Sequence, residues 1–204
     1  MLVIGLTGSA GMGKSTVAAH LRARGIPVLD ADAEVHRLYD GAAAPLIEAA
    51  FPGTTADGRV DRKKLSAALL RDPDALRRLE AIVHPLVQAA ERGFLQRSFA
   101  QGAAIAVLEI PLLFETGGDR CVDVTIVVSA PADVQLERML ARPDMSPEKL
   151  DALLARQLPD AEKRARADFI VDTSRTIPET LAQADRIIET LRGRQGAAFQ
   201  QCWA

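Results

Sequence analysis

The stretch GSAGMGKST, residues 8–16, constrains the fold of this chain more than any other part of it. It matches the pattern G-x-x-x-x-G-K-[ST] from Gly8 to Ser15, after an apolar run and before a segment with helical spacing. Glycine permits backbone angles and close approaches that a Cβ forbids, so such a loop can turn its N–H groups toward phosphate oxygens at a helix N-terminus. A glycine-rich turn that binds nothing is the less favoured alternative, because strand, loop and helix occur in the order that the motif requires.

The pattern gives the polar residues of this loop distinct roles. Lys14 is expected to reach the β- and γ-phosphates, Ser15 to give its hydroxyl to magnesium, and Thr16 to lie on the α-phosphate side. ATP and Mg²⁺ are therefore the expected cofactors. The candidate nucleotide-binding residues are Gly8, Gly11, Met12, Gly13, Lys14, Ser15 and Thr16.

Five short apolar runs rich in valine and isoleucine predict the strands of a sheet that is covered on both faces. Helical patterns lie between them, and Thr176 and Glu179 have capping-box spacing at the start of the last one. Strand and helix alternate, so the expected fold is α/β: a P-loop NTPase-type parallel five-stranded sheet flanked by helices, with right-handed crossovers. The predicted strands are residues 2–6, 26–30, 104–110, 122–129 and 168–172.

Two long connections interrupt this alternation and predict a helical lobe at 31–103 and a lid at 141–167. In the lobe, helical patterns begin at Asp61, Pro73 and Pro85, which places prolines at helix starts. In the lid, Ser146 is expected to cap a short helix. We expect one domain over 1–204, with a core made of 1–30, 104–140 and 168–194.

The composition argues against several classes of partner. The formal net charge is −2 and the 25 basic residues are scattered, so neither nucleic acid nor an anionic membrane surface is an expected partner. No segment has the form of a signal peptide or a membrane span. Cys121 and Cys202 have no metal or redox spacing, which fits a reducing compartment, so each is expected to be structural or incidental. A cytoplasmic protein, monomeric or weakly oligomeric, is expected.

Carboxylates follow two of the predicted strands, at the edge where open parallel sheets bind ligands. Asp32 could accept the proton of an incoming hydroxyl, while capping of the next helix is the main alternative for Asp30 and a weaker one for Asp32. Glu109 ends the third strand, where P-loop enzymes carry the acid that supports magnesium. A merely solvated strand-end carboxylate is an equally weighted alternative for Glu109.

Several other polar residues have more open interpretations. Arg138 and Arg142 are four apart on a predicted helix and could clamp the transferred phosphoryl group, although exposed arginines are common on helices. Arg156 and Gln157 are weaker lid candidates, and the charges of EKRARAD, 162–168, predict a solvated face. His84 lies between two predicted helices, where a lone histidine is more often structural than catalytic.

Taken together and in this order, these segments resemble the dephospho-coenzyme A kinase family. The resemblance implies transfer of the ATP γ-phosphoryl group to the ribose 3′-hydroxyl of dephospho-coenzyme A, with Asp32 as the base and His84, Leu113 and Glu115 on the acceptor side. Residues 9–12 differ from those more usual in the family, and this change adds bulk at Met12. Thr173–Ser174 also differ from the usual residues, at the place that the resemblance puts beside the adenine. The segments that carry the resemblance are GLTGSAGMGKSTV at 5–17, DADAEVHRL at 30–38, DRKKL at 61–65, His84–Pro85, IPLLFE at 110–115 and ADFIVD at 167–172.

Two other functions fit parts of the pattern. A P-loop alone does not identify the acceptor, so a kinase for a nucleoside monophosphate or a sugar acid is one alternative. A nucleotide-dependent switch protein is another, disfavoured because the sequence has no N-K-x-D motif and because a lobe with a lid suits the enclosure of a small substrate.

Overall fold

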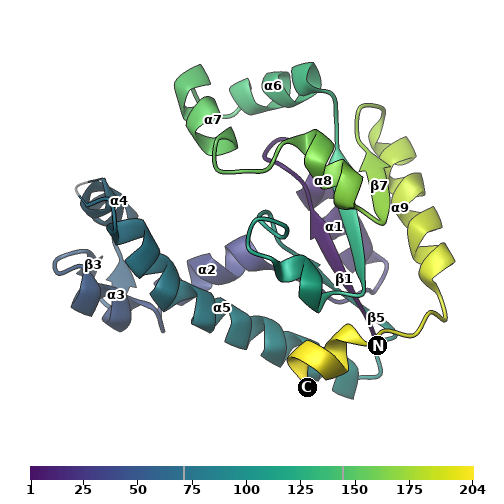
Figure 1. The fold of residues 1–204 in the computed structure, drawn as a ribbon, viewed down its shortest axis with the longest axis horizontal. Coiled ribbons are helices and arrows are strands. Elements are labelled where there is room, and N and C mark those ends of the chain that lie inside the picture. The colour runs from purple at the N-terminus through teal and green to yellow at the C-terminus, as the bar shows by residue number, and fades with distance from the viewer. Residues whose placement is uncertain (71, 144) are drawn as a thin grey trace. The chain divides into compact units, whose positions relative to one another are not determined.

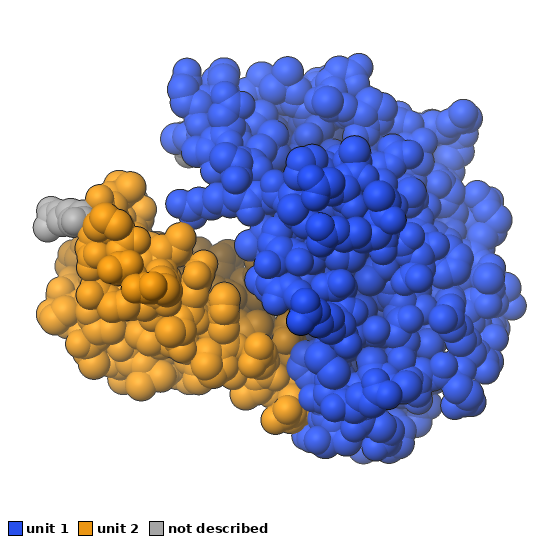
Figure 2. Space-filling view, in the orientation of Figure 1, with its two compact units in different colours: residues 1–29, 95–204 blue, residues 30–94 orange. Residues whose placement is uncertain are grey.

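The structure, a computed structural model, describes residues 1–70, 72–143 and 145–204. The chain forms two compact units, one of residues 1–29 and 95–204 and the other of residues 30–94 (Figure 2). No helix in the described chain has both the length and the apolar character that a membrane span requires.

The larger unit is built on a five-stranded sheet with the strand order β2-β5-β1-β6-β7 (Figure 1). The pairings of β1 with β5, β1 with β6, and β6 with β7 are parallel, which confirms the predicted α/β fold. All five predicted strands are present, with small differences at their ends. Their bounds are β1 Leu2–Thr7, β2 Val28–Asp30, β5 Ile105–Glu109, β6 Val124–Ser129 and β7 Phe169–Asp172.

One face of the sheet is covered by α1, Lys14–Ala23, and α9, Ile177–Leu191. Alternate residues of β1 and β6 pack there against the two helices in a single apolar cluster, because successive strand side chains point to opposite faces. Thr176 and Glu179 form the predicted capping box at the start of α9. The cluster comprises Leu2, Ile4, Leu6, Val17, Ala18, Leu21, Val107, Val124, Ile126, Val128, Val171, Ala184, Ile187, Ile188 and Leu191.

The opposite face of the sheet carries the residues that alternate with this cluster. Gly5 of β1 faces Leu113 and Val122, where an added Cβ would come within 2.7 Å of the Leu113 side chain. On β6, Ser129 donates a hydrogen bond of 2.7 Å to Asp160 at the start of α8, Asp160–Arg166. The loop after β5 and α8 therefore lie on this face, and the short helix η1, Gly118–Cys121, follows that loop in the chain.

The predicted lid region contains the short helix α7, Pro147–Leu154, and α8 (Figure 1). Helix α6, Ala132–Leu140, precedes this region. The Ser146 hydroxyl accepts a hydrogen bond from the Lys149 N–H, which confirms the predicted cap. Of the predicted lid, Asp144 lies outside the described residues.

The smaller unit is mainly helical and has its own apolar cluster, which includes Ile47, Leu65 and Leu79. Asp61 caps α4 at the predicted helix start, although Arg71, the last residue of that predicted helix, lies outside the described residues. A short hairpin, β3 with β4, was not predicted. The element bounds are α2 Ala31–Tyr39, α3 Ala44–Ala50, β3 Thr55–Ala56, β4 Arg59–Val60, α4 Arg62–Leu69 and α5 Ala75–Ala100, of which residues 95–100 belong to the larger unit.

The prediction that a new helix begins at Pro85 is wrong. Helix α5 runs through Pro85 without a break. Val83 before the proline, and Leu86 and Val87 after it, pack on the same apolar cluster. Burial on both sides of Pro85 offsets the hydrogen bond that proline cannot donate, so packing overrides the local signal.

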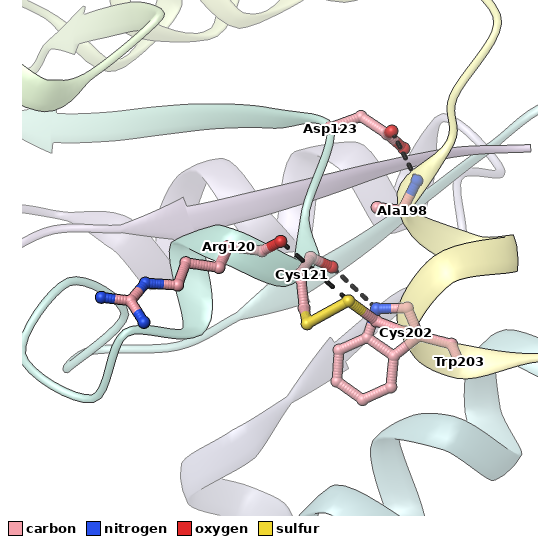
Figure 3. The surroundings of a disulfide bond; sticks show 6 residues. All are labelled: Arg120, Cys121, Asp123, Ala198, Cys202 and Trp203. Atoms are coloured by element: carbon pink, nitrogen blue, oxygen red, sulfur yellow. Dashed lines mark hydrogen bonds between the residues drawn. A yellow bond between two sulfur atoms is a disulfide. The ribbon is translucent and has the colours of Figure 1, made fainter.

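The two cysteines are paired in a disulfide, a pairing that the sequence analysis did not predict. The bond joins Cys121, at the end of η1, to Cys202 in the C-terminal helical turn η2, Phe199–Trp203 (Figure 3). Trp203 Nε1 donates a hydrogen bond of 2.7 Å to the Cys121 carbonyl, and Phe199 stacks on Phe99. The tail, whose packing the sequence left open, is thus held against the larger unit. A separation of 81 residues gave no sign of this pairing.

Glu91 predicts an unusual dependence of stability on pH. Burial raises the pKa of this carboxyl from its ordinary value of 4.5 to about 7. Between these values the folded state keeps a proton that the unfolded state has lost, so the free energy of unfolding falls as the pH rises. Glu91→Gln should therefore gain up to about 3 kcal/mol over the wild type at pH 8 and much less at pH 5, measured by urea denaturation. Glu80→Gln, an exposed change on the same helix, is the control; an equal gain there would contradict the prediction.

The disulfide predicts a redox-dependent melting temperature. Reduction with dithiothreitol should destabilise the wild type by about 2–4 kcal/mol, because the cross-link restricts the unfolded chain. Differential scanning fluorimetry should show a drop of several degrees. Cys202→Ser should start at the lower melting temperature and show no shift with reductant. A wild type that melts equally with and without reductant would refute the expected contribution of the cross-link.

Candidate functional site

The loop from Gly8 to Ser15 joins β1 to α1, in the strand, loop and helix context that the motif predicts. At Gly8 an added Cβ would lie 2.4 Å from the Val128 carbonyl oxygen, so no other residue fits there without moving β6. Gly13 has φ of 87° and precedes the first turn of α1. The first N–H groups of α1 have no partner within the helix, and this end of the helix favours an anion.

Met12 adds bulk to the loop without filling the space in front of it. Its side chain is 2% exposed, and its sulfur lies 3.1 Å from the Ala130 backbone N–H. The side chain thus points into the core beside the end of β6. The bulk at position 12 is accommodated away from the exposed side chains of Ser15 and Thr16.

Glu109 is a buried carboxylate at the carboxyl end of β5 that pairs with two cations of α1. Its side chain is 2% exposed, and its two oxygens lie 3.4 Å from Lys14 Nζ and 3.3 Å from Arg22 Nη2. A merely solvated carboxylate was the alternative for Glu109, and this burial contradicts that alternative. Arg22 was missed, although Lys14, Ala18 and Arg22 are spaced four apart along one face of α1.

The oxygen atoms near Lys14 are of the kind that Mg²⁺ prefers. Ser15 offers a hydroxyl and Glu109 a carboxylate, both hard oxygen ligands. Among the described residues, no group of three His, Cys, Asp or Glu side chains could hold a metal alone. This set fits an ion that is held largely by phosphate and water oxygens, as Mg²⁺ usually is.

Arg138 and Arg142 do not share a helix as predicted. Helix α6 ends at Leu140, so only Arg138 belongs to it, while Arg142 lies beyond the helix and is exposed. Arg138 donates hydrogen bonds of 2.9 Å to Thr173 Oγ1 and 2.6 Å to the Thr173 carbonyl. Thr173 Oγ1 in turn donates to the Met12 carbonyl at 2.8 Å. Arg138 therefore connects α6, the loop after β7 and the Gly8–Ser15 loop, which is called the nucleotide loop below.

Two glutamines hold the Ala10 residue of the loop. Gln135 of α6 donates a hydrogen bond of 2.7 Å to the Ala10 carbonyl, and Gln157 accepts one of 3.2 Å from the Ala10 N–H. Gln157 was a weak lid candidate in the sequence, and Gln135 was missed because a glutamine on a helix carries no distinctive pattern.

Leu113 and Glu115, expected on the acceptor side, have side chains inside the larger unit. Leu113 is fully buried, and Glu115 forms an ion pair of 2.9 Å with Lys163, which is itself fully buried. The solvated face predicted for EKRARAD is therefore wrong at Lys163. The direct contact of Leu113 and Glu115 with an acceptor that the resemblance implies stays a prediction.

Three further candidates belong to the smaller unit. Asp30 caps α2 by accepting a hydrogen bond of 3.0 Å from the Ala33 N–H, so the capping alternative is confirmed for Asp30. Asp32 lies exposed in the first turn of α2, and His84 is exposed on α5. The capping alternative does not apply to Asp32, because Asp30 is the cap.

The parallel sheet and the Gly8–Ser15 loop, with Lys14 beside a strand-end carboxylate, define a nucleotide-binding protein of the P-loop kinase class. The sequence model of the dephospho-CoA kinase family matches residues 2–179. The chain belongs to the dephospho-CoA kinase family.

Individual relatives agree with this assignment. The dephospho-CoA kinase of Mesorhizobium japonicum is 58% identical over 97% of this chain and 100% of its own length. A crystal structure from Thermus thermophilus has a TM-score of 0.81 at 37% identity, covering 94% of this chain and 97% of the other. The dephospho-CoA kinase from Campylobacter jejuni has a TM-score of 0.70 at 27% identity, covering 93% and 96%.

Met12→Ser tests the place of this side chain in the core. The burial of Met12 predicts a loss of about 2–4 kcal/mol in unfolding free energy. Urea denaturation measures this loss. Met12→Leu, which keeps the volume, should cost less than about 1.5 kcal/mol. Equal stability of Met12→Ser and wild type would place the side chain outside the core.

Proposed function

We propose that the protein transfers the γ-phosphoryl group of ATP to the ribose 3′-hydroxyl of dephospho-coenzyme A, giving coenzyme A and ADP in the final step of coenzyme A biosynthesis. The observation that carries the proposal is the Gly8–Ser15 loop with Lys14 beside Glu109, in a chain of this family. Phosphoryl transfer asks little covalent chemistry of the protein, so positioning and charge neutralisation supply most of the catalysis.

The nucleotide end of the reaction is assigned to the loop and its neighbours. The backbone N–H groups of the loop and of the first turn of α1 bind the phosphates. Lys14 leaves or shares its ion pair with Glu109 to neutralise the β- and γ-phosphates, and Arg22 keeps the Glu109 charge paired. Arg138 holds the Thr173 loop, which the family resemblance places beside the adenine.

Mg²⁺ is the proposed metal cofactor. Ser15 and Glu109 are the residues that would hold it, Ser15 directly and Glu109 directly or through water. When bound, the ion neutralises charge on the β- and γ-phosphates. Lys14 and the loop amides act on the same phosphates independently of it.

At the acceptor end, Asp32 is the proposed general base. Its exposed carboxylate would accept the hydroxyl proton as that oxygen attacks the γ-phosphorus. His84 is proposed to bind the acceptor, and Arg142, exposed after α6, is proposed to neutralise the transferred group. The resemblance places Leu113 and Glu115 on the acceptor side, whereas their burial and the Glu115–Lys163 ion pair support a role in holding the loop after β5 in its conformation.

The same proposal covers location and assembly. A cytoplasmic enzyme, monomeric or weakly oligomeric and without a nucleic-acid or membrane partner, fits the net charge of −2. The disulfide of Cys121 is unusual for a reducing compartment, where such bonds are mostly redox-responsive. A thiol titration of freshly lysed cells would show whether the pair is reduced there.

Two substitutions test the assigned roles. Lys14→Ala should lower turnover severely and weaken ATP binding, because the phosphates lose their principal side-chain cation. Asp32→Asn should lower kcat by about 10² to 10⁴-fold while ATP binding persists, because only proton transfer is lost. Coupled ADP release measures kcat, and calorimetry measures ATP binding. Near-normal turnover of Asp32→Asn would remove the base assignment.

A panel of acceptors tests the substrate. ADP release should depend on dephospho-coenzyme A and remain at background with nucleoside monophosphates or sugar acids. Turnover of another acceptor would replace the substrate assignment, and hydrolysis stimulated only by a protein partner would indicate a switch protein.

A further inference from the structure

Lys163 is buried in a way that its sequence context does not suggest. It lies in α8 within a run of charged residues, yet its side chain is 0% exposed. Lysines are rarely buried so completely unless they are paired. Its Nζ lies 2.9 Å from Glu115 Oε1 and donates a hydrogen bond of 3.1 Å to the Pro111 carbonyl.

The two oxygens that contact Lys163 also bind groups near the nucleotide loop. The Pro111 carbonyl accepts a second hydrogen bond, of 3.2 Å, from Thr7 Oγ1, on the residue directly before Gly8. Glu115 Oε1 also accepts a hydrogen bond of 2.8 Å from the Leu158 N–H. The ion pair therefore connects the end of β1 to the segment that follows α7.

The residue before Leu158 contacts the Gly8–Ser15 loop directly. Gln157, its neighbour, accepts a hydrogen bond from the Ala10 N–H at 3.2 Å. Because Leu158 and Gln157 are adjacent, fixing the Leu158 backbone limits where the Gln157 side chain can reach. Gln135 binds the Ala10 carbonyl, so the placement of Gln157 decides whether Ala10 is held at both its N–H and its carbonyl.

Stability alone is a weak explanation for this ion pair. Desolvation of two charges often cancels their attraction, and apolar replacements of buried pairs are frequently neutral. Glu115 Oε2 is buried and has no hydrogen-bond partner among the described residues, which adds to the cost. What the pair supplies, and an apolar pair would not, is an acceptor for the Leu158 N–H at a fixed place.

We infer that Lys163 and Glu115 are positioning residues, whose buried ion pair places Gln157 against the Ala10 N–H and so keeps the nucleotide loop in its ATP-binding conformation. This inference rests on the proposed function and assigns Glu115 to the nucleotide end of the reaction. It predicts that the pair affects ATP and leaves the acceptor unaffected.

The test compares Lys163→Met, Glu115→Gln and Gln157→Ala with the wild type, well below their melting temperatures. Each should raise the Kd and the KM for ATP about three- to tenfold, the equivalent of one neutral hydrogen bond. The KM for dephospho-coenzyme A should change less than about twofold. The double variant Lys163→Met with Gln157→Ala should bind ATP no more weakly than the single variant with the higher Kd, because both substitutions act through one contact.

Asp160→Ala is the matched control, because it removes the acceptor of the Ser129 hydrogen bond and leaves the side chains of Glu115 and Gln157 unchanged. It should lower the melting temperature without changing the KM for ATP. If Lys163→Met does not fold, Glu115→Gln and Gln157→Ala still carry the test.

Three results would overturn the inference: a changed melting temperature with an unchanged Kd for ATP, a raised KM for dephospho-coenzyme A alone in Glu115→Gln, or multiplicative effects in the double variant. Calorimetry with ATP alone keeps this test separate from the proposed function. A wild type that binds ATP but does not phosphorylate dephospho-coenzyme A would refute the proposed acceptor. The positioning inference would then be tested by the Kd for ATP of the variants alone.

Discussion

A buried carboxylate at the end of β5 organises the nucleotide end of this protein. Glu109 is almost completely removed from water, so its charge requires compensation, and Lys14 and Arg22 on one face of α1 provide it. Removing either cation would leave a buried charge underpaired. The two ion pairs join α1 to the end of β5, and Lys14 lies directly after the glycine loop, where the motif requires a lysine.

The conformation of the loop depends on residues far from it in sequence. Gly8 lies against the backbone of β6, Met12 packs beside Ala130, and two glutamines hold Ala10. Thr173 adds a further connection to the Met12 carbonyl. Most of these contacts are polar and specific, so they orient the loop amides before any ligand arrives, which lowers the cost of binding.

The sequence predicted best where local chemistry and burial agree. The five strands, the capping box at Thr176, the helix start at Asp61 and the cap at Ser146 all appeared as expected. Prediction failed where packing opposed the local signal, as at Pro85, where apolar residues on both sides of the proline keep one helix intact. It failed at Lys163 for a related reason: only the fold supplies the partner that allows a lysine to be buried.

By itself, the sequence determined the order of strands and helices along the chain, the phosphate-binding loop and the family, because motifs and hydrophobic periodicity are local properties. Only the tertiary structure decided the pairing of Cys121 with Cys202, the partners of Glu109 and the contacts of Gln157. Each of these depends on residues dozens of positions apart, and their proximity results from packing of the whole sheet and its helices. No spacing within the chain encodes such proximity.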